Sequence, residues 1–217
     1  MSAPQPARPP EPVVLEGRYV RLEPIGPQHA ADLFAAMRGP ELEARFDWLS
    51  EYQPASEAEL RERLVAAAAA TDKPMWAVID VASGRAEGRQ CLMRIVPQHG
   101  VIEIGNVYWG PRLARTRRAT EALALHARYV FETLGYRRFE WKCNARNAAS
   151  QAAARRFGFA YEGVFRQHMI VKGVNRDTSW FAMLDSDWVR LAPEYERWLA
   201  PANFTADGTQ VTPLRFA

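Results

Sequence analysis

The sequence predicts an α/β (α+β) fold, in which a mixed, mostly antiparallel sheet of six to seven strands carries helices on both faces. One observation is that the apolar residues change period along the chain, alternating in some stretches and following helical spacing in others. The other is a strand, helix, strand, helix order over residues 101–157, inside an otherwise antiparallel run. Two parallel strands need a crossover helix between them, so we expect one β-α-β-α unit at the centre of the sheet.

The N-terminal third is expected to hold one strand and two helices. Residues 13–22 alternate in polarity like a strand, and a stretch rich in proline and glycine ends it. Apolar residues then follow helical spacing as far as Gly39 and Pro40, which stop the first helix. After an irregular aromatic stretch, Ser56 and Glu59 form a capping box that begins the second helix.

The rest of the chain returns to strands and then alternates. Three strands, at residues 75–81, 90–96 and 101–109, are separated by short turns that contain glycine, which predicts an antiparallel meander. A short basic loop follows, and a long helix runs from it to Gly135. The remaining elements are expected at residues 138–143 (strand), 147–157 (helix), 159–171 and 176–184 (strands) and 186–199 (helix).

The length of 217 residues, with 48% hydrophobic and 24% charged residues, is typical of one globular domain. We expect a flexible proline-rich leader over residues 1–12, a single domain over residues 13–199 and a C-terminal arm over residues 200–217. No stretch reaches the roughly 20 apolar residues of a membrane span. Cys91 and Cys143 provide neither a disulfide framework nor the spacing of a metal site. The sequence therefore predicts a cytoplasmic protein without membrane contact or metal ion.

The charge balance gives little indication of a partner. The net charge is +3, and the 28 basic residues include three lysines, which leaves 25 arginines. The 25 acidic residues are interspersed among them, so a nucleic-acid partner is not expected. Seven tryptophans and two long final strands leave a homodimer open as an alternative to a monomer.

The basic loop before the long helix is a candidate anion site. Arg112, Arg115, Arg117 and Arg118 fall within seven residues at the expected helix start. A helix N-terminus offers unpaired backbone N–H groups and a partial positive charge, which suit a phosphate. The alternative is a solvated basic helix start without a ligand.

Polar residues on two neighbouring strands form a second candidate site. Asn144, Asn147 and Ser150 follow a strand as it passes into a helix, where they serve either as helix caps or as the lining of a ligand slot. Glu103 stands among apolar residues of the strand at 101–109, so its carboxylate lies either on a solvated face or in a functional site.

Several short motifs follow one another in a fixed order along residues 13–185. They are Leu15–Leu22, Glu103-Ile-Gly105, Thr120-Glu-Ala122, Asn144, Asn147, Ser150, Phe157-Gly-Phe159, Glu162-Gly163, Phe165-Arg166 and Asp177. In this order and spacing the chain resembles the GCN5-related N-acetyltransferases (GNAT), in the branch of the ribosomal-protein N-terminal acetyltransferases. No single motif is decisive, but together they are specific.

The resemblance implies acetyl-CoA as cosubstrate and no metal. In that family the strand matching residues 101–109 splays from its neighbour to admit the pantetheine arm, and the loop before the long helix binds the pyrophosphate. Here arginine replaces a family glycine in that loop, with Ala114, Arg117 and Ala119, or Arg115, Arg118 and Thr120, at the motif positions. The residues expected to bind the cosubstrate are Val107, Tyr108, Trp109, Arg112, Leu113, Arg115, Arg117, Arg118, Ala119, Thr120, Asn144, Asn147 and Ser150.

The resemblance also suggests catalytic residues. Glu103 matches the carboxylate proposed as general base in this branch, and a backbone N–H near residues 107–109 is the expected oxyanion donor. Many relatives use a tyrosine as the acid, but Ala154 occupies that position here. Ser150 is the favoured replacement as the group that protonates the leaving thiolate, with Tyr108 and Tyr161 as alternatives.

The expected activity is transfer of an acetyl group from acetyl-CoA to a primary amine, by direct attack in a ternary complex. The acceptor is a protein N-terminus or a small amine, and nothing in the sequence selects one. A non-catalytic module that binds or senses acyl-CoA is the alternative. Residues 41–55, the hairpin at 164–176 and the C-terminal arm are expected to shape the acceptor pocket. The candidates there are Arg45, Asp47, Trp48, Arg166 and His168.

Overall fold

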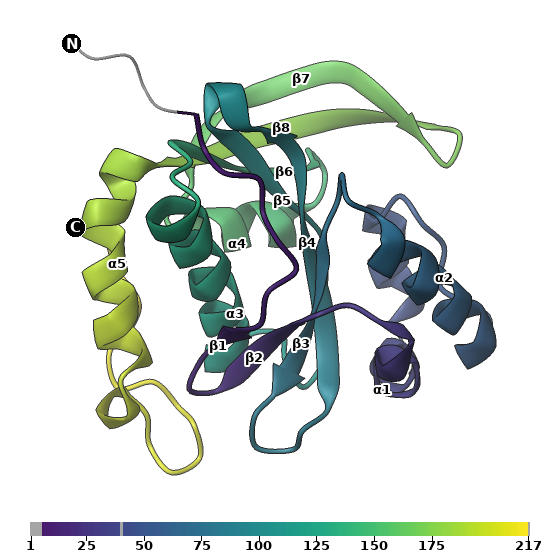
Figure 1. The fold of residues 1–217 in the computed structure, drawn as a ribbon, viewed down its shortest axis with the longest axis horizontal. Coiled ribbons are helices and arrows are strands. Elements are labelled where there is room, and N and C mark those ends of the chain that lie inside the picture. Colours follow the sequence, from purple (N-terminus) through teal and green to yellow (C-terminus); the bar gives the residue numbers. More distant parts are fainter. Residues whose placement is uncertain (1–5, 40, 217) are drawn as a thin grey trace.

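The computed structural model describes residues 6–39 and 41–216, which contain one eight-stranded sheet (Figure 1). Its order is β1-β2-β3-β4-β5-β6-β8-β7, and within the described residues every neighbouring pair is antiparallel except β5 and β6. The strands are β1 (Leu15–Glu16), β2 (Val20–Pro24), β3 (Met75–Asp80), β4 (Ala86–Val96), β5 (Val101–Trp109), β6 (Arg138–Asn144), β7 (Ala160–Val171) and β8 (Val174–Leu184). The predicted mixed, mostly antiparallel sheet with one crossover is confirmed.

The helices cover both faces of this sheet (Figure 1). They are α1 (Ala30–Met37), α2 (Glu57–Ala69), α3 (Arg117–Arg128), α4 (Ala148–Arg156) and α5 (Asp185–Leu199), and a π-helical turn at Tyr129–Thr133 extends α3. Alternating residues of β3 show the two layers: Trp76 and Val78 belong to the core with α3 and α5, whereas Ala77 and Ile79 belong to the core with α1 and α2. No helix of the described residues is both long and apolar enough to cross a membrane.

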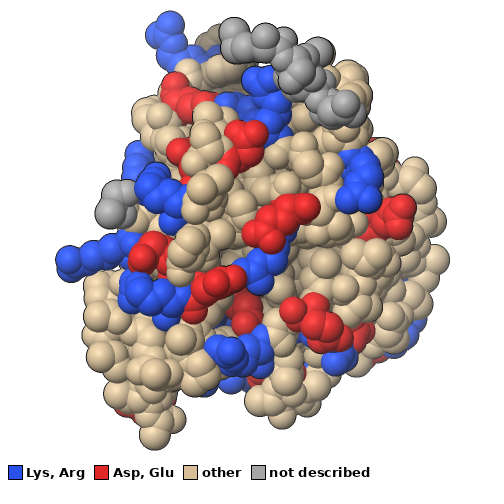
Figure 2. Space-filling model, turned by 60° about the vertical axis from the view of Figure 1, so that its left-hand side comes forward, with Lys and Arg blue, Asp and Glu red and all other residues tan. Residues whose placement is uncertain are grey.

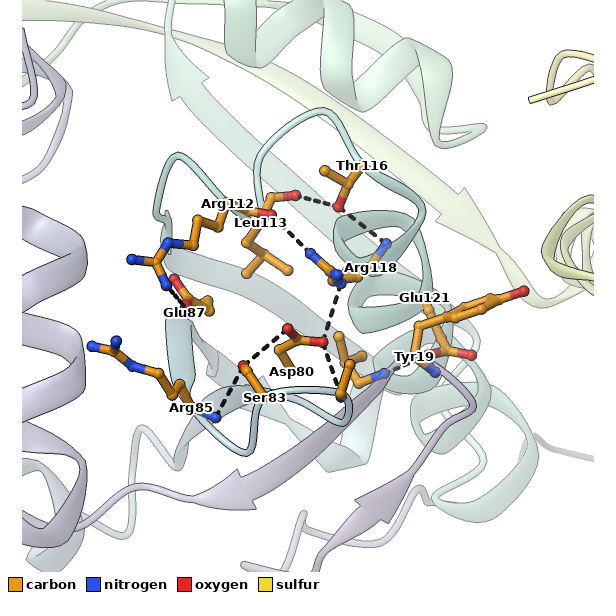
Figure 3. Close-up of polar contacts among 12 residues, drawn as sticks. Tyr19, Asp80, Ser83, Arg85, Glu87, Arg112, Leu113, Thr116, Arg118 and Glu121 are labelled. Carbon is orange, nitrogen blue, oxygen red and sulfur yellow. Dashed lines mark hydrogen bonds and ion pairs between the residues drawn. The ribbon is translucent and has the colours of Figure 1, made fainter. Parts of the chain in front are cut away.

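The N-terminal strand expected at residues 13–22 is two strands, which raises the count from seven to eight. β1 and β2 pair antiparallel, with Leu15 opposite Leu22, around a tight turn. The carboxylate of Glu121 on α3 accepts hydrogen bonds from the backbone N–H groups of Arg18, Tyr19 and Val20 at 2.6–2.8 Å. Figure 3 shows Glu121 beside Tyr19. The residue that stabilises this turn is about a hundred positions away, so local periodicity could not reveal it.

Residues 6–12 of the expected leader form hydrogen bonds with the rest of the domain, and residues 1–5 lie outside the described residues. The N–H of Ala7 donates to the Pro97 carbonyl at 3.1 Å, and the N–H of Arg8 donates to the Leu134 carbonyl at 2.8 Å. The N–H of Glu11 donates to the Tyr129 hydroxyl. The segment lies along the edge of the α3 layer and closes part of the core.

β4 begins earlier than the strand expected at residues 90–96. The residues at its start include Glu87 and Arg89, which are both buried. Glu87 faces Arg112, and Arg89 forms an ion pair with Glu51. A buried charge is tolerated in a central strand only when it is paired, and these partners lie far away in the sequence.

The C-terminal arm packs closely against the rest of the protein. Asn203 is buried and its side chain bonds to the carbonyls of Trp198 and Thr212. The Phe204 ring lies edge-on to Trp198 at 5.0 Å between centroids. On the face shown in Figure 2, basic and acidic side chains are interspersed, without an extended area of one sign.

Candidate active site

The centre of the sheet opens where β5 and β6 part. Their parallel pairing runs from Val101 opposite Arg138 to Ile104 opposite Trp141 and stops there. Beyond that point β5 stays paired with β4, and β6 stays paired with β8. A Cβ placed on Gly105, the next residue of β5, would lie 2.2 Å from the Met93 sulfur, so a larger residue at the start of the gap would require the Met93 side chain to move.

A cavity of about 1080 Å³ runs through this gap and reaches both sheet faces. Ile104 and Trp141 pack in the core with α3, so the neighbouring Glu103 and Lys142 point to the opposite face. We call the part of the cavity beside α3 the α3 half; its lining includes residues 114–117, Ala119 and Thr120, most of α4, Trp198, Phe204 and Gln210. We call the part on the opposite face the hairpin half; its lining includes Arg45, Trp48, Met93, Arg94, Glu103, Lys142, His168, Met169, Arg176 and Thr178.

The α3 half is built around the start of a helix. Thr116 is the N-cap: its hydroxyl oxygen accepts from the Arg118 N–H at 3.2 Å, and its O–H donates to the Leu113 carbonyl at 2.7 Å (Figure 3). The N–H groups of Arg117 and Ala119, in the same first turn, have no partner inside the helix. Two backbone donors at the positive end of the α3 dipole therefore lie at the wall of the cavity.

The four clustered arginines divide into two pairs. Arg112 faces the buried carboxylate of Glu87, and Arg118 forms an ion pair with Asp80 at 3.1 Å (Figure 3). Arg115 and Arg117, in contrast, line the cavity.

Aromatic rings fix the guanidinium of Arg117. It lies 4.3 Å from the ring centroid of Tyr19 and 4.9 Å from that of Phe204, in favourable cation–π geometry. A third arginine of this half, Arg156 on α4, donates to the Thr120 hydroxyl at 3.0 Å. Three guanidinium groups thus surround the first turn of α3.

The hairpin half contains a buried cluster of charges. The Lys142 ammonium lies 2.9 Å from the Glu103 carboxylate and 2.6 Å from that of Glu140, and 3.7 Å above the Trp180 ring. Arg94 approaches Glu103 at 3.1 Å from a strand position with φ of 48°. Burial raises the pKa of Glu103, although Lys142 and Arg94 oppose this effect. A carboxylate with a raised pKa at a cavity wall is suited to proton transfer.

The start of α4 supplies polar groups between the two halves. The Asn147 side chain caps α4 by accepting from the Ser150 N–H at 3.0 Å. The Ser150 hydroxyl oxygen accepts from the Trp141 indole N–H at 3.0 Å. Burial raises the pKa of the neighbouring Cys143 thiol, while a hydrogen bond from Ser150 lowers it.

The structure brings most of the predicted site residues together around this cavity. Val107, Tyr108, Trp109, Arg115, Arg117, Ala119, Thr120, Asn147, Ser150 and Glu103 line it. The other four predicted cosubstrate residues have structural contacts instead. Leu113 is fully buried in the core, Asn144 accepts from the Arg146 N–H, and Arg112 and Arg118 are paired as described.

The expected acceptor pocket is found only in part at this cavity. Arg45, Trp48 and His168 line its hairpin half, whereas Asp47 and Arg166 do not reach it. Lys172, in the turn between β7 and β8, donates to the Phe46 carbonyl at 2.7 Å and so ties the hairpin to the segment opposite. Ala154 is fully buried in the core, so no side chain reaches the cavity from the position where many relatives have tyrosine.

Sequence reasoning missed five lining residues of consequence: Arg94, Lys142, Arg156, Arg176 and Gln210. The alternation of Phe139, Trp141 and Cys143 with charged residues was a usable signal, because it placed Lys142 on the same face as Glu140. Arg176 and Gln210 lie in the hairpin and the arm that were expected to shape the acceptor pocket, but neither residue was singled out. Among the described residues, no group of His, Cys, Asp and Glu is arranged to hold a metal ion.

Comparisons with known proteins agree with this geometry. A family model described as an acetyltransferase (GNAT) domain matches residues 20–160. A GCN5-related N-acetyltransferase from Brucella melitensis is 53% identical, with a TM-score of 0.94, over 97% of this chain and 96% of that one. A probable acetyltransferase of the GNAT family from Chromobacterium violaceum is 41% identical, with a TM-score of 0.79, over 85% of this chain and 92% of that one.

A third solved structure shares the fold alone. It is the ribosomal-protein-S5-alanine acetyltransferase from Vibrio fischeri, which is 16% identical, with a TM-score of 0.63, over 81% of this chain and 98% of that one. The search of curated proteins gave no match.

Proposed function

This chain belongs to the GNAT family of acetyltransferases, and we propose that it transfers an acetyl group from acetyl-CoA to a primary amine by direct attack in a ternary complex. The observation that carries the proposal is the cavity through the gap between β5 and β6, with a helix N-terminus on one side and a buried glutamate on the other. We place the branch with the ribosomal-protein N-terminal acetyltransferases, and we treat residues 13–199 as one acetyltransferase domain.

The α3 half fits the phosphates of acetyl-CoA. The free N–H groups of Arg117 and Ala119 and the guanidinium groups of Arg115, Arg117 and Arg156 offer both hydrogen bonds and charge to a pyrophosphate. The gap beyond Gly105 is the path for a narrow pantetheine arm toward Glu103. When bound, acetyl-CoA supplies an acyl group activated as a thioester.

Glu103 is proposed as the general base. An amine reaches the site as an ammonium ion and must lose a proton before its nitrogen can attack. The carboxylate of Glu103 accepts that proton, and its raised pKa brings it closer to the pKa of the amine than an exposed glutamate would be. Lys142 and Arg94 hold the carboxylate in place and stabilise its charged form.

Ser150 and the β5 backbone complete the proposed machinery. As the C–N bond forms and the C–S bond breaks, the Ser150 hydroxyl gives a proton to the thiolate, the nitrogen loses its second proton to solvent, and Ser150 takes a proton back from solvent. The pairing of β4 and β5 shifts register opposite Asn106 and Val107, and such a bulge leaves a backbone N–H outside the ladder. That N–H supports the assignment of the oxyanion donor to this part of β5.

The proposed acceptor is a protein N-terminus or a small amine, and the proposed location is the cytoplasm, where Cys91 and Cys143 stay as free thiols. The first test compares thermal unfolding with acetyl-CoA, CoA, dephospho-CoA and ATP. A ligand at 100 times its Kd adds about 2.7 kcal/mol of stability, which raises Tm by several degrees. Stabilisation by acetyl-CoA but not by ATP, followed by CoA release with an amine, is the expected result. Absence of any shift at millimolar acetyl-CoA contradicts the proposal.

A further inference from the structure

Positively charged side chains greatly outnumber negatively charged ones along the wall of the cavity. Seven cationic side chains line it, and Glu103 is the one carboxylate among the lining residues that the structure describes. Arg115, Arg117 and Arg156 surround the first turn of α3, where the proposed cosubstrate places its phosphates. The other four, Arg45, Arg94, Lys142 and Arg176, line the hairpin half. This second group lies away from the proposed phosphate site, so those phosphates do not neutralise it.

Three of these four cations already have partners. Lys142 is shared between Glu103 and Glu140, and Arg94 is paired with Glu103. Arg45 donates to the carbonyl of Trp109 at 2.5 Å. Glu103 and Glu140 therefore hold Lys142, and Glu103 also holds Arg94.

Arg176 is the fourth of these cations, and its surroundings differ from those of the other three. Its position on β8 places its side chain on the same sheet face as Thr178 and Trp180, toward Lys142. Its Nε is buried and has no hydrogen-bond partner, and the structure gives its guanidinium no carboxylate partner among residues 6–39 and 41–216. Burial lowers its pKa, Cys143 and Glu103 oppose this effect, and repulsion from Arg94 adds to it. Arg176 is half-buried, lines the cavity and has an Nε without a hydrogen-bond partner, so this position is suited to an anionic ligand.

The neighbouring His168 experiences the positive potential of the same cations. The pKa of His168 is lowered, first by burial and then by repulsion from Arg94, Arg176 and Lys142. His168 also lines the hairpin half. Arg94, Arg176 and Lys142 thus all act on the part of the cavity proposed for the acceptor. They repel any further positive charge there.

Resting on the proposed function, we infer that the acceptor is a small primary amine with its own anionic group, as in a free amino acid or an aminoalkyl phosphonate. The amine faces Glu103 and the anion faces Arg176, so one molecule satisfies the base and the unpaired guanidinium. A polyamine or a polycationic amino sugar would bring several positive charges against Arg94, Lys142 and Arg176, and these charges would weaken its binding.

The test is CoA release from acetyl-CoA with matched acceptors. Each of the common amino acids is compared with its own α-amide, which differs only in lacking the carboxylate, and aminoalkyl phosphonates, spermidine and short peptides complete the panel. We expect the preferred acids to have a kcat/KM at least tenfold above that of their amides, and spermidine to be inactive. Equal or faster turnover of amides or spermidine overturns the inference. So does an acetyl-CoA-bound enzyme that accepts none of the acids, or that accepts only peptides.

Arg176→Gln checks the residue. It is expected to raise the KM of the preferred acid at least tenfold, to leave the KM of an amide acceptor unchanged, and to leave the Kd of acetyl-CoA unchanged. Arg176→Lys, which keeps the charge, is expected to recover part of the affinity. Arg146→Gln is the matched control, because Arg146 is exposed and lies outside the cavity lining.

An unchanged KM for the acid in Arg176→Gln removes Arg176 from acceptor binding and overturns the inference. Failure of the proposed function has a different signature. In that case acetyl-CoA neither stabilises the protein nor releases CoA with any amine.

Discussion

Glu121 and Glu103 are both buried glutamates, with 6% and 5% of their surface exposed, but their surroundings differ completely. Glu121 accepts three backbone hydrogen bonds from the turn between β1 and β2 and does not line the cavity. Glu103 faces the Lys142 ammonium and the Arg94 guanidinium, and it does line the cavity. Burial of a carboxylate therefore does not mark a functional site; the nature of its partners does.

The same distinction separates the arginines of the basic loop. Arg112 and Arg118 are paired with Glu87 and Asp80 and stabilise the fold, whereas Arg115 and Arg117 present their charges to the cavity. For the glutamates and for the loop arginines alike, residues of one type have different partners in the structure. Some stabilise the fold, and the others line the cavity. The comparison can be tested by substituting one member of a pair at a time.

The largest effect is expected from Glu103→Gln, which keeps the shape and removes the base. Loss of general base catalysis should lower kcat by at least about 100-fold, with the Kd of acetyl-CoA nearly unchanged. Steady-state kinetics and calorimetric titration measure the two quantities, and Glu121→Gln is the control substitution of equal size. If the kcat of Glu103→Gln stays within a factor of two of the wild-type value, Glu103 is not the general base.

Glu121→Ala should instead act on stability. It leaves the N–H groups of Arg18, Tyr19 and Val20 without an acceptor, at a cost of about 3 kcal/mol or more. At about 2–4 °C per kcal/mol for a chain of this size, Tm should fall by roughly 6–12 °C in a thermal melt. Glu121→Gln, which keeps one carbonyl oxygen, should lose less. If the melting curve of Glu121→Ala matches that of the unchanged protein, the turn does not depend on this carboxylate.

Arg117→Gln and Arg112→Gln sharpen the comparison within the basic loop. Loss of the Arg117 charge from the α3 half should weaken acetyl-CoA binding about tenfold, as for one charge-assisted hydrogen bond. Arg112→Gln removes a charge five positions away that faces Glu87, so it should leave the Kd within a factor of two. Calorimetric titration of both variants is the measurement. Equal losses in both would show that only the net charge of the loop matters.

The smallest effect concerns pH. Glu103 accepts a proton only when ionised, so the rate falls as pH drops through its pKa, which burial places above the ordinary glutamate value. Arg94 lowers that pKa, and in Arg94→Gln the acid limb of the pH–rate profile should move to higher pH. Because Arg94 is 42% exposed, the shift should be less than about one pH unit. A shift to lower pH contradicts the assignment of Glu103 as the titrating base.

The order of elements, the crossover and the helix faces could be predicted from the sequence because they depend on the local period of apolar residues. Three features could not be predicted. The turn between β1 and β2 depends on Glu121, the start of β4 depends on ion pairs to Glu51 and Arg112, and Arg176 enters the cavity from the far end of the chain. Each depends on a charged side chain whose surroundings in space come from distant parts of the sequence.

In the candidate site too, the sequence predicted the features that depend on nearby residues and not those that depend on distant ones. Helix caps and loop arginines are local signals, so Arg115, Arg117, Asn147 and Ser150 were predicted and do line the cavity. Whether an arginine faces a cavity or a carboxylate depends on the tertiary structure, and the side chains of Arg112 and Arg118 face Glu87 and Asp80. The boundaries of the domain and the location in the cell stay predictions.

The long-range hydrogen bonds of Glu121 also constrain how the protein forms during synthesis. Val20 and Glu121 are 101 residues apart, so at roughly 5–20 residues per second the turn between β1 and β2 leaves the ribosome about 5–20 s before its acceptor does. During that interval water must satisfy its N–H groups. The turn between the first two strands therefore cannot be completed until α3 has been synthesised, and a chaperone has several seconds in which to bind it.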